Sequence, residues 1–204
     1  GNAQTFRRRK MFDFDVGLHY IGDCGPGGIF PTILEQAGIA DQIEFVPMDQ
    51  DGFETLRFPD MTFRVPAGWE RYRQRLHEAF PQEAQAIDRY IDFLRAIGGV
   101  FMGTPPPAEV PLAQRLGKPW PQCTLGEVFD ALEISQRLRH VLGIQCGLYA
   151  APWSKASAAM HALVIDHYLR GAYFIRGGGR PLVEGLVRAI QKNGGEVWLR
   201  SRVQ

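Results

Sequence analysis

The segment "FDFDVGLHYIGDCGPGG" at residues 12–28 places the carboxylates of Asp13 and Asp15, a histidine next to a tyrosine, and a glycine-rich loop close together in the sequence. A strand, a glycine loop and a helix in this order often hold a phosphate group, because backbone N–H groups at the helix start point toward it. The spacing matches neither common phosphate motif. A dinucleotide fingerprint would need a third glycine where Phe30 stands, and the Gly-Lys-Ser/Thr sequence of a P-loop is absent. We therefore interpret residues 22–28 as a tight turn that uses positive φ angles.

Asp13 and Asp15 lie on the same side of the predicted strand, where paired carboxylates could hold a divalent cation. The motif is only three residues long and common by chance, and the five histidines have no metal-ligand spacing. We predict no metal site. Cys24 lies beside a helix start, which favours a thiolate, but the sequence offers no partner group, so we interpret this cysteine as structural.

A second glycine loop occurs in "IRGGGRPLVEGL" at residues 175–186. Three glycines precede a predicted helix, and the backbone N–H groups at such a start suit an anion or the polar edge of a ring system. The same glycines would also permit close packing of the helix on a strand. Both interpretations stay open from the residues alone.

The composition is that of an ordinary globular protein, with 45% hydrophobic and 22% charged residues and a formal net charge of +1. We interpret the basic run "RRRK" at residues 7–10 as a solvated turn and predict no nucleic-acid partner. Three scattered cysteines indicate a reducing compartment, so we expect a cytoplasmic protein. No apolar run reaches the ~18 residues of a membrane span. The many aromatic residues suit either a core or the wall of an apolar pocket.

The pattern of apolar residues, glycines and caps predicts an α+β fold, with a small mixed sheet and a largely helical middle. Strands are expected at residues 11–17, 43–48, 53–58, 61–65 and 196–203, with another just before the triple glycine, and a hairpin joins 53–58 to 61–65. Helices are expected at 29–38, 69–80, 83–97, 136–149 and 155–170 and after the triple glycine, and a T-x-x-E capping box at 124–127 starts one more. Ser154 would cap the helix at 155–170. Glycines and prolines at 98–107 predict a mobile loop or lid.

Both ends of the chain resemble a known family. The run "GNAQTF…FDFDVGLHYIG" resembles the segment after the first dinucleotide-binding unit in flavoproteins of the amine oxidase and carotenoid desaturase superfamily. The form "GLHYIG", together with "HYLRGAYFIRGGGRPLVEGL", is similar to the retinol saturase branch of that superfamily. The middle, 49–150, is weakly matched.

The resemblance implies an FAD cofactor and a set of site residues. Gly177 and Gly178 would come near the flavin ring, and Val203 would touch the adenine through its backbone. His19 and Tyr20 would lie at the floor of a substrate cavity, and His19, Tyr20 and Tyr168 are the candidate proton donors. The other cofactor-binding residues that the resemblance implies are Gly1, Asn2, Thr5, Asp15 and Gly17.

The resemblance also implies a division of the chain and an activity. Residues 1–22 would be a remnant of an FAD-binding domain, 23–175 a substrate-binding domain and 176–204 a return to the FAD-binding domain. Because G-x-G-x-x-G is absent, we expect an internal piece that is inactive and binds FAD poorly without the remainder of its parent chain. The full protein would be an FAD-dependent oxidoreductase of the two-domain FAD/NAD(P)-binding type.

Its substrate would be a hydrophobic small molecule, and it would act on conjugated C=C bonds of a polyene or isoprenoid by reduction, desaturation or isomerisation. Peripheral membrane contact is plausible for so apolar a substrate. The alternative is a non-catalytic α+β module that binds a lipid or a partner protein.

Overall fold

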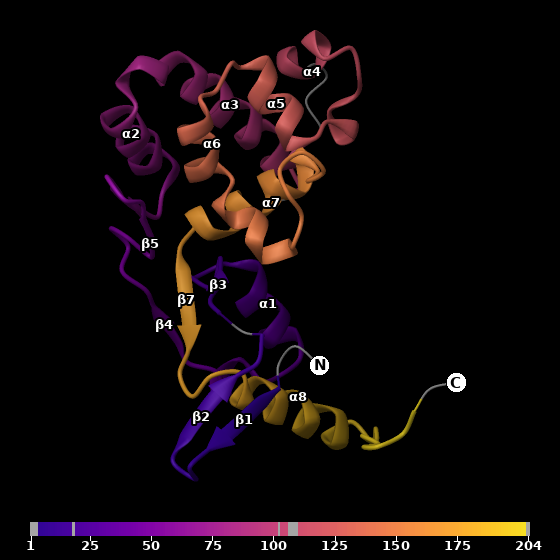
Figure 1. Cartoon of the computed structure of the whole chain (residues 1–204). Helices are drawn as coiled ribbons and strands as arrows, with labels where there is room; N and C mark the ends of the chain where they lie inside the picture. The colour runs from indigo at the N-terminus through magenta and orange to yellow at the C-terminus, as the bar shows by residue number, and fades with distance from the viewer. Residues whose placement is uncertain (1–3, 18, 102, 106–109, 203–204) are drawn as a thin grey trace. The chain divides into compact units, whose positions relative to one another are not determined.

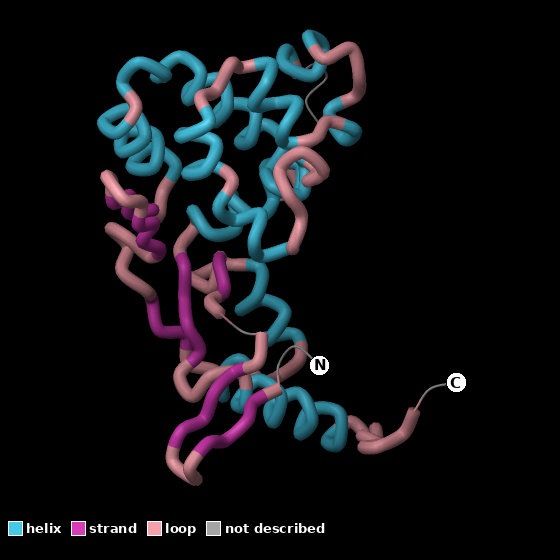
Figure 2. Tube along the Cα trace, viewed as in Figure 1, coloured by secondary structure: helices cyan, strands magenta, loops and turns pink. Residues whose placement is uncertain are grey.

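The chain forms two compact units in a computed structural model that describes residues 4–17, 19–101, 103–105 and 110–202. Unit 1 combines residues 1–48 with 171–204, and unit 2 is the continuous stretch 49–170. Figure 1 and Figure 2 show the elements of each unit. The predicted domain division stays a prediction. In the structure, the first helix and the strand near residue 46 belong to the same compact unit as the N-terminal and C-terminal segments.

Unit 1 is built on three short strands with β7 in the centre, in the order β3–β7–β4, and both pairings are antiparallel. A separate antiparallel hairpin joins β1 to β2, and its turn residues Arg9 and Lys10 have positive φ angles. Leu34, Ile39 and Ile175 are buried together as the core. The elements are β1 (Thr5–Arg8), β2 (Phe12–Asp15), β3 (Ile21–Gly22), α1 (Ile29–Gln36), β4 (Phe45–Pro47), β7 (Ala172–Ile175) and α8 (Arg180–Lys192), with a 3₁₀ turn at Ala40–Gln42.

Unit 2 is mainly helical, with one antiparallel hairpin of β5 and β6. The helices are α2 (Trp69–Ala79), α3 (Ala84–Phe101), α4 (Pro111–Arg115), α5 (Leu125–Ala131), α6 (Gln136–Leu142) and α7 (Ala158–Leu169), the strands are β5 (Glu54–Arg57) and β6 (Thr62–Val65), and 3₁₀ turns occur at Pro81–Glu83, Trp120–Gln122 and Ile144–Tyr149. None of the helices in the described part of the chain is long and apolar enough to cross a membrane.

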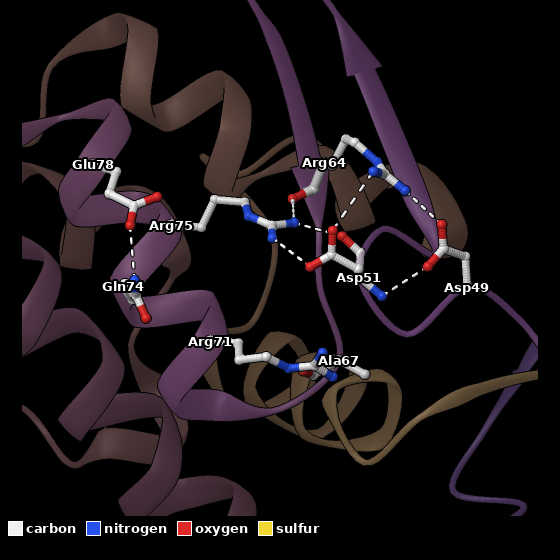
Figure 3. A network of polar contacts seen from close by, with 8 residues as sticks. All are labelled: Asp49, Asp51, Arg64, Ala67, Arg71, Gln74, Arg75 and Glu78. Carbon is white, nitrogen blue, oxygen red and sulfur yellow. Dashed lines mark hydrogen bonds and ion pairs between the residues drawn. The ribbon is translucent and has the colours of Figure 1, made fainter.

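A polar network connects the β5–β6 hairpin to α2 (Figure 3). The Arg75 guanidinium donates to a carboxylate oxygen of Asp51 at 2.7 Å and to the backbone oxygen of Arg64 at 3.1 Å. The Arg64 side chain in turn binds the Asp49 carboxylate. The hydrogen bond from Arg75 lowers the pKa of Asp51. The network links the hairpin, and the turn before it, to the helix that follows.

The helix and hairpin predictions are largely confirmed. The predicted hairpin is β5–β6. The capping box forms as expected: the Thr124 side chain accepts from the Glu127 N–H, and the Glu127 carboxylate accepts from the Thr124 N–H at 2.8 Å. The predicted stops Gly38, Gly171 and Gly194 have φ angles of +69°, +118° and +79°. Such angles favour glycine because it carries no Cβ.

The prediction of a loop from residue 98 is wrong for 98–101, because α3 continues to Phe101. Gly98 is buried against α7, and a Cβ there would lie 3.1 Å from the Asp166 Cβ and 3.4 Å from the Ala162 carbonyl oxygen. The glycine is therefore a contact point between two helices. Burial of the apolar face of α3 outweighs the ~1 kcal/mol that glycine costs within a helix.

Three further predictions are wrong in detail. Ser157, not Ser154, caps α7, and its side chain accepts from the Met160 N–H at 3.3 Å. The helix expected at 136–149 ends at Leu142, beyond which the chain is a 3₁₀ turn. Residues 196–202 form no strand, because no described segment pairs with their backbone groups.

The α+β class itself is confirmed. The described strand pairs are all antiparallel and form three small sheets in place of the one mixed sheet that we expected.

Candidate functional site

A pocket of about 440 Å³ lies at the start of α8 in unit 1. Four of the predicted cofactor-binding residues line it, two from the β1–β2 hairpin and two from the triple-glycine loop. The lining residues are Thr5, Asp13, Phe14, Asp15, Phe174, Gly177, Gly178, Arg180, Pro181 and Glu184. The fold thus brings together residues that lie more than 160 positions apart in the sequence.

The triple glycine allows strand β2 to approach the backbone at the helix start. Gly177 and Gly178 have φ angles of +85° and +73°. A Cβ on Gly178 would lie 2.5 Å from one carboxylate oxygen of Asp15, which is closer than real Cβ atoms come. The other carboxylate oxygen of Asp15 accepts a hydrogen bond from the Gly179 N–H at 2.8 Å. Asp15, on a distant strand, therefore binds the backbone N–H of Gly179, the N-cap residue of α8.

The charges around the pocket are arranged in pairs. Arg7 binds Asp13 through two hydrogen bonds of 2.8 Å, and Arg180 lies 3.4 Å from the same carboxylate and from the Thr5 hydroxyl. The hydrogen bond from Arg7 lowers the pKa of Asp13, which stays ionised. Within the described residues, no group of three His, Cys, Asp or Glu side chains could hold a metal ion.

The triple glycine suggested two ligand types, an anion or the polar edge of a ring system, and the position of Asp15 distinguishes between them. Since this carboxylate already occupies the helix start, an added anion would meet a negative charge there. A hydroxyl or ring N–H would instead find carboxylate oxygens that accept hydrogen bonds. The geometry therefore favours the polar edge of a ring or sugar over a phosphate.

Sequence comparison gives independent information on what this pocket belongs to. No protein-family model matches the chain. The chain is 31% identical to the all-trans-retinol 13,14-reductase of Macaca fascicularis over 220 residues, and 30% identical to those of Danio rerio and Homo sapiens. Each alignment covers 100% of the chain and 36% of the relative.

The predicted resemblance to the retinol saturases is confirmed. The similarity extends through the middle of the chain, 49–150, where the sequence motifs were weakest. The chain spans about a third of the length of these curated relatives.

The glycine loop before α1 has a structural role in this retinol saturase-like chain. Asp23 and Gly27 have positive φ angles, and the Asp23 carboxylate accepts from the Ile29 N–H at 3.3 Å. The loop thus caps its own helix, in agreement with the tight turn that we predicted. Burial, and then the charge of Asp23, raise the pKa of the Cys24 thiol to about 12, so no thiolate forms near neutral pH.

The three candidate proton donors are divided between the two units. His19 is exposed and Tyr20 half-buried in the segment between β2 and β3 of unit 1. Tyr168 lies on α7 of unit 2, half-buried, with its ring centroid 6.4 Å from that of Phe53. Burial, and then the charge of Glu54, raise the pKa of Tyr168 and keep its hydroxyl protonated. Their role as proton donors stays a prediction.

Some predicted residues have no test in the structure. Gly1, Asn2 and Val203 lie outside the described residues. Gly17 follows β2 and is exposed, and it is not among the described lining residues of the pocket. Sequence reasoning missed Arg180 and Glu184, although their position after the triple glycine was a signal that they could line the same pocket.

Proposed function

We propose that this chain is part of an FAD-dependent oxidoreductase that acts on a conjugated C=C bond of a polyene or isoprenoid substrate. The observation that carries the proposal is the 31% identity, over the whole chain, to an enzyme named for the reduction of retinol. The pocket at the start of α8 supports it, because Thr5, Asp15, Gly177 and Gly178 line one cavity.

The residues around this pocket fit one part of FAD. Gly177 and Gly178 carry no side chain, which lets the Asp15 carboxylate lie against the loop at the edge of the pocket. Asp15 and the Thr5 hydroxyl would accept hydrogen bonds from ring or sugar groups. Because three carboxylates, those of Asp13, Asp15 and Glu184, line the pocket, we assign it to the uncharged part of the cofactor and not to the pyrophosphate. The chemistry that such a cofactor would supply, when bound and reduced, is hydride transfer.

The protein residues would supply a proton and an apolar environment. Tyr168 is one of the three candidate donors; its raised pKa keeps the hydroxyl protonated but also makes it a weaker acid. A hydrophobic substrate, a cytoplasmic location and peripheral contact with a membrane belong to the same proposal. We propose reduction of the substrate, because the relatives are named reductases. An assay could instead detect desaturation or isomerisation of the substrate.

The test uses the full-length protein that carries this chain, purified and examined for a flavin absorption spectrum. The critical variant is Gly178→Ala, because its Cβ would displace the Asp15 carboxylate. The matched control is Gly194→Ala at the other end of α8, which has a similar φ of +79° and no atom within 4 Å of the added Cβ. G178A should lose most of its flavin while G194A retains it.

The flavin spectrum of the full-length protein also tests the alternative function, that of a non-catalytic binding module. A colourless full-length protein that takes up no added FAD would contradict the proposal and favour a non-catalytic module that binds a lipid or a partner. If flavin is bound, turnover of an all-trans-retinol substrate by Tyr168→Phe then tests the proton donor. Unchanged turnover would remove Tyr168 from the mechanism.

A further inference from the structure

A second cavity, of about 450 Å³, lies within the helical unit between α3, α4 and the end of α5. This volume lies in the range of small-molecule sites, which usually have apolar walls and a few placed polar groups. Every lining residue belongs to unit 2, so the cavity is a separate site from the pocket at α8.

The floor of this cavity is apolar. Phe93 of α3, Val110 and Leu112 around the start of α4, and Leu132 after α5 are all buried and line the cavity. Ala96 lies one turn beyond Phe93 on the same face of α3 and contributes only a methyl group to the wall. A small side chain at this position keeps space open for an apolar chain.

Two unpaired cations lie at the rim. Arg89 of α3 and Arg115 of α4 line the cavity and are exposed, and neither forms a hydrogen bond or ion pair with another residue in the part of the chain that the structure describes. Asp92, the one acid among the described lining residues, already binds Arg73 at 2.9 Å. The rim therefore presents two positive charges that no residue in the described part of the chain pairs with.

We propose that this cavity binds a free fatty carboxylate, with its alkyl chain on the apolar floor and its carboxylate between Arg89 and Arg115. Arginine suits a carboxylate because its planar fork donates two parallel hydrogen bonds. The combination of an apolar floor and a cationic rim excludes a neutral or cationic amphiphile as the preferred ligand. The inference does not rest on the flavin proposal, since the two sites share no residue.

The test measures binding of laurate to the purified protein by isothermal titration calorimetry, below the micelle concentration, with 1-dodecanol as the uncharged analogue. Laurate should bind at least tenfold more tightly than dodecanol. The double variant R89Q/R115Q should weaken laurate binding about tenfold, a loss of ~1.4 kcal/mol, and leave dodecanol unchanged. The matched control is R95Q, since Arg95 is an exposed arginine of α3 that pairs with Glu70 and does not line the cavity.

A blocking variant tests the cavity itself. Ala96→Trp should abolish laurate binding, and because Ala96 is exposed, the helical circular dichroism should stay that of the wild type. The proposal is overturned if wild type gives no laurate binding, if dodecanol binds equally well, or if folded A96W still binds. Binding to phosphatidylglycerol vesicles without binding of laurate would overturn it in favour of a membrane surface. Flavin content of A96W, which should be normal, separates this result from the fate of the flavin proposal.

Discussion

His161 is expected to make the stability of the helical unit depend on pH. Its ring is fully buried on α7. The Nε2 atom lies 2.9 Å from the Tyr90 hydroxyl, and the Nδ1 atom lies 2.8 Å from the Tyr149 hydroxyl. A neutral imidazole can donate through one nitrogen and accept through the other, so it satisfies both tyrosines. Burial therefore lowers the pKa of His161 to about 3, from an ordinary 6.5.

The sign of the effect follows from which state binds the proton. Below pH 6.5 the unfolded chain protonates this histidine, whereas the folded chain keeps it neutral down to about pH 3. The free energy of unfolding is therefore highest above pH 6.5 and falls by ~1.4 kcal/mol per pH unit below it. Between pH 7 and pH 5 this group alone should lower it by ~2 kcal/mol. Glu127 does not contribute in that window, because its pKa of about 2 and its ordinary 4.5 both lie below pH 5.

The assay is urea denaturation at pH 5, 6 and 7, followed by tryptophan fluorescence. Three of the four tryptophans, Trp69, Trp120 and Trp153, lie in unit 2, so the signal reports mainly on the helical unit. His161→Gln should lower stability at pH 7 by ~1–3 kcal/mol, since one tyrosine hydroxyl loses its partner. The variant should also lose most of the decline between pH 7 and pH 5.

The control is His140→Gln on α6, because His140 is exposed. It should keep the wild-type dependence on pH. The reasoning is refuted if the wild-type free energy of unfolding changes by less than ~0.5 kcal/mol between pH 7 and pH 5, or if H161Q retains the full slope.

Two further predictions concern positions where the structure changed or sharpened the interpretation of the sequence. Ser157→Ala should lower the free energy of unfolding by ~1 kcal/mol through loss of the α7 cap, whereas Ser154→Ala should change it by less than ~0.5 kcal/mol; equal effects in urea titrations would contradict the corrected cap assignment. Cys24 should resist Ellman's reagent at pH 8, because a pKa of about 12 leaves only ~10⁻⁴ of the thiol as thiolate. It should react once urea unfolds the chain. Rapid modification of Cys24 in the native protein, located by peptide mass analysis, would count against the buried thiol.

Local signals in the sequence predicted those features that depend on a few neighbouring residues. The Thr124 capping box needs only a threonine and a glutamate three positions apart. Gly38, Gly171 and Gly194 end helices because a positive φ is required at a single position. Such features form wherever the chain carries them, so they can be predicted without knowledge of distant segments.

Features that depend on distant partners could not be predicted in the same way. Gly98 looked like a helix stop, but its lack of a side chain serves the contact of α3 with Asp166 of α7. The candidate site shows the same division. The glycines of the α8 loop could be identified from the sequence, but the hydrogen bond from Gly179 to Asp15 joins residues across most of the chain. The resemblance to a known family provided that long-range information, and spacing alone did not.

The discontinuity of unit 1 has a consequence for how the protein is made. Its central strand, β7, lies between β3 and β4 but follows them in the chain by more than 120 residues. A ribosome therefore releases β3 and β4 long before the strand that joins them, whereas the continuous stretch 49–170 can fold as it emerges. We expect the middle of the chain to reach its native structure first. The early strands would stay exposed until then, so a nascent chain stalled before residue 172 should be a substrate for chaperones.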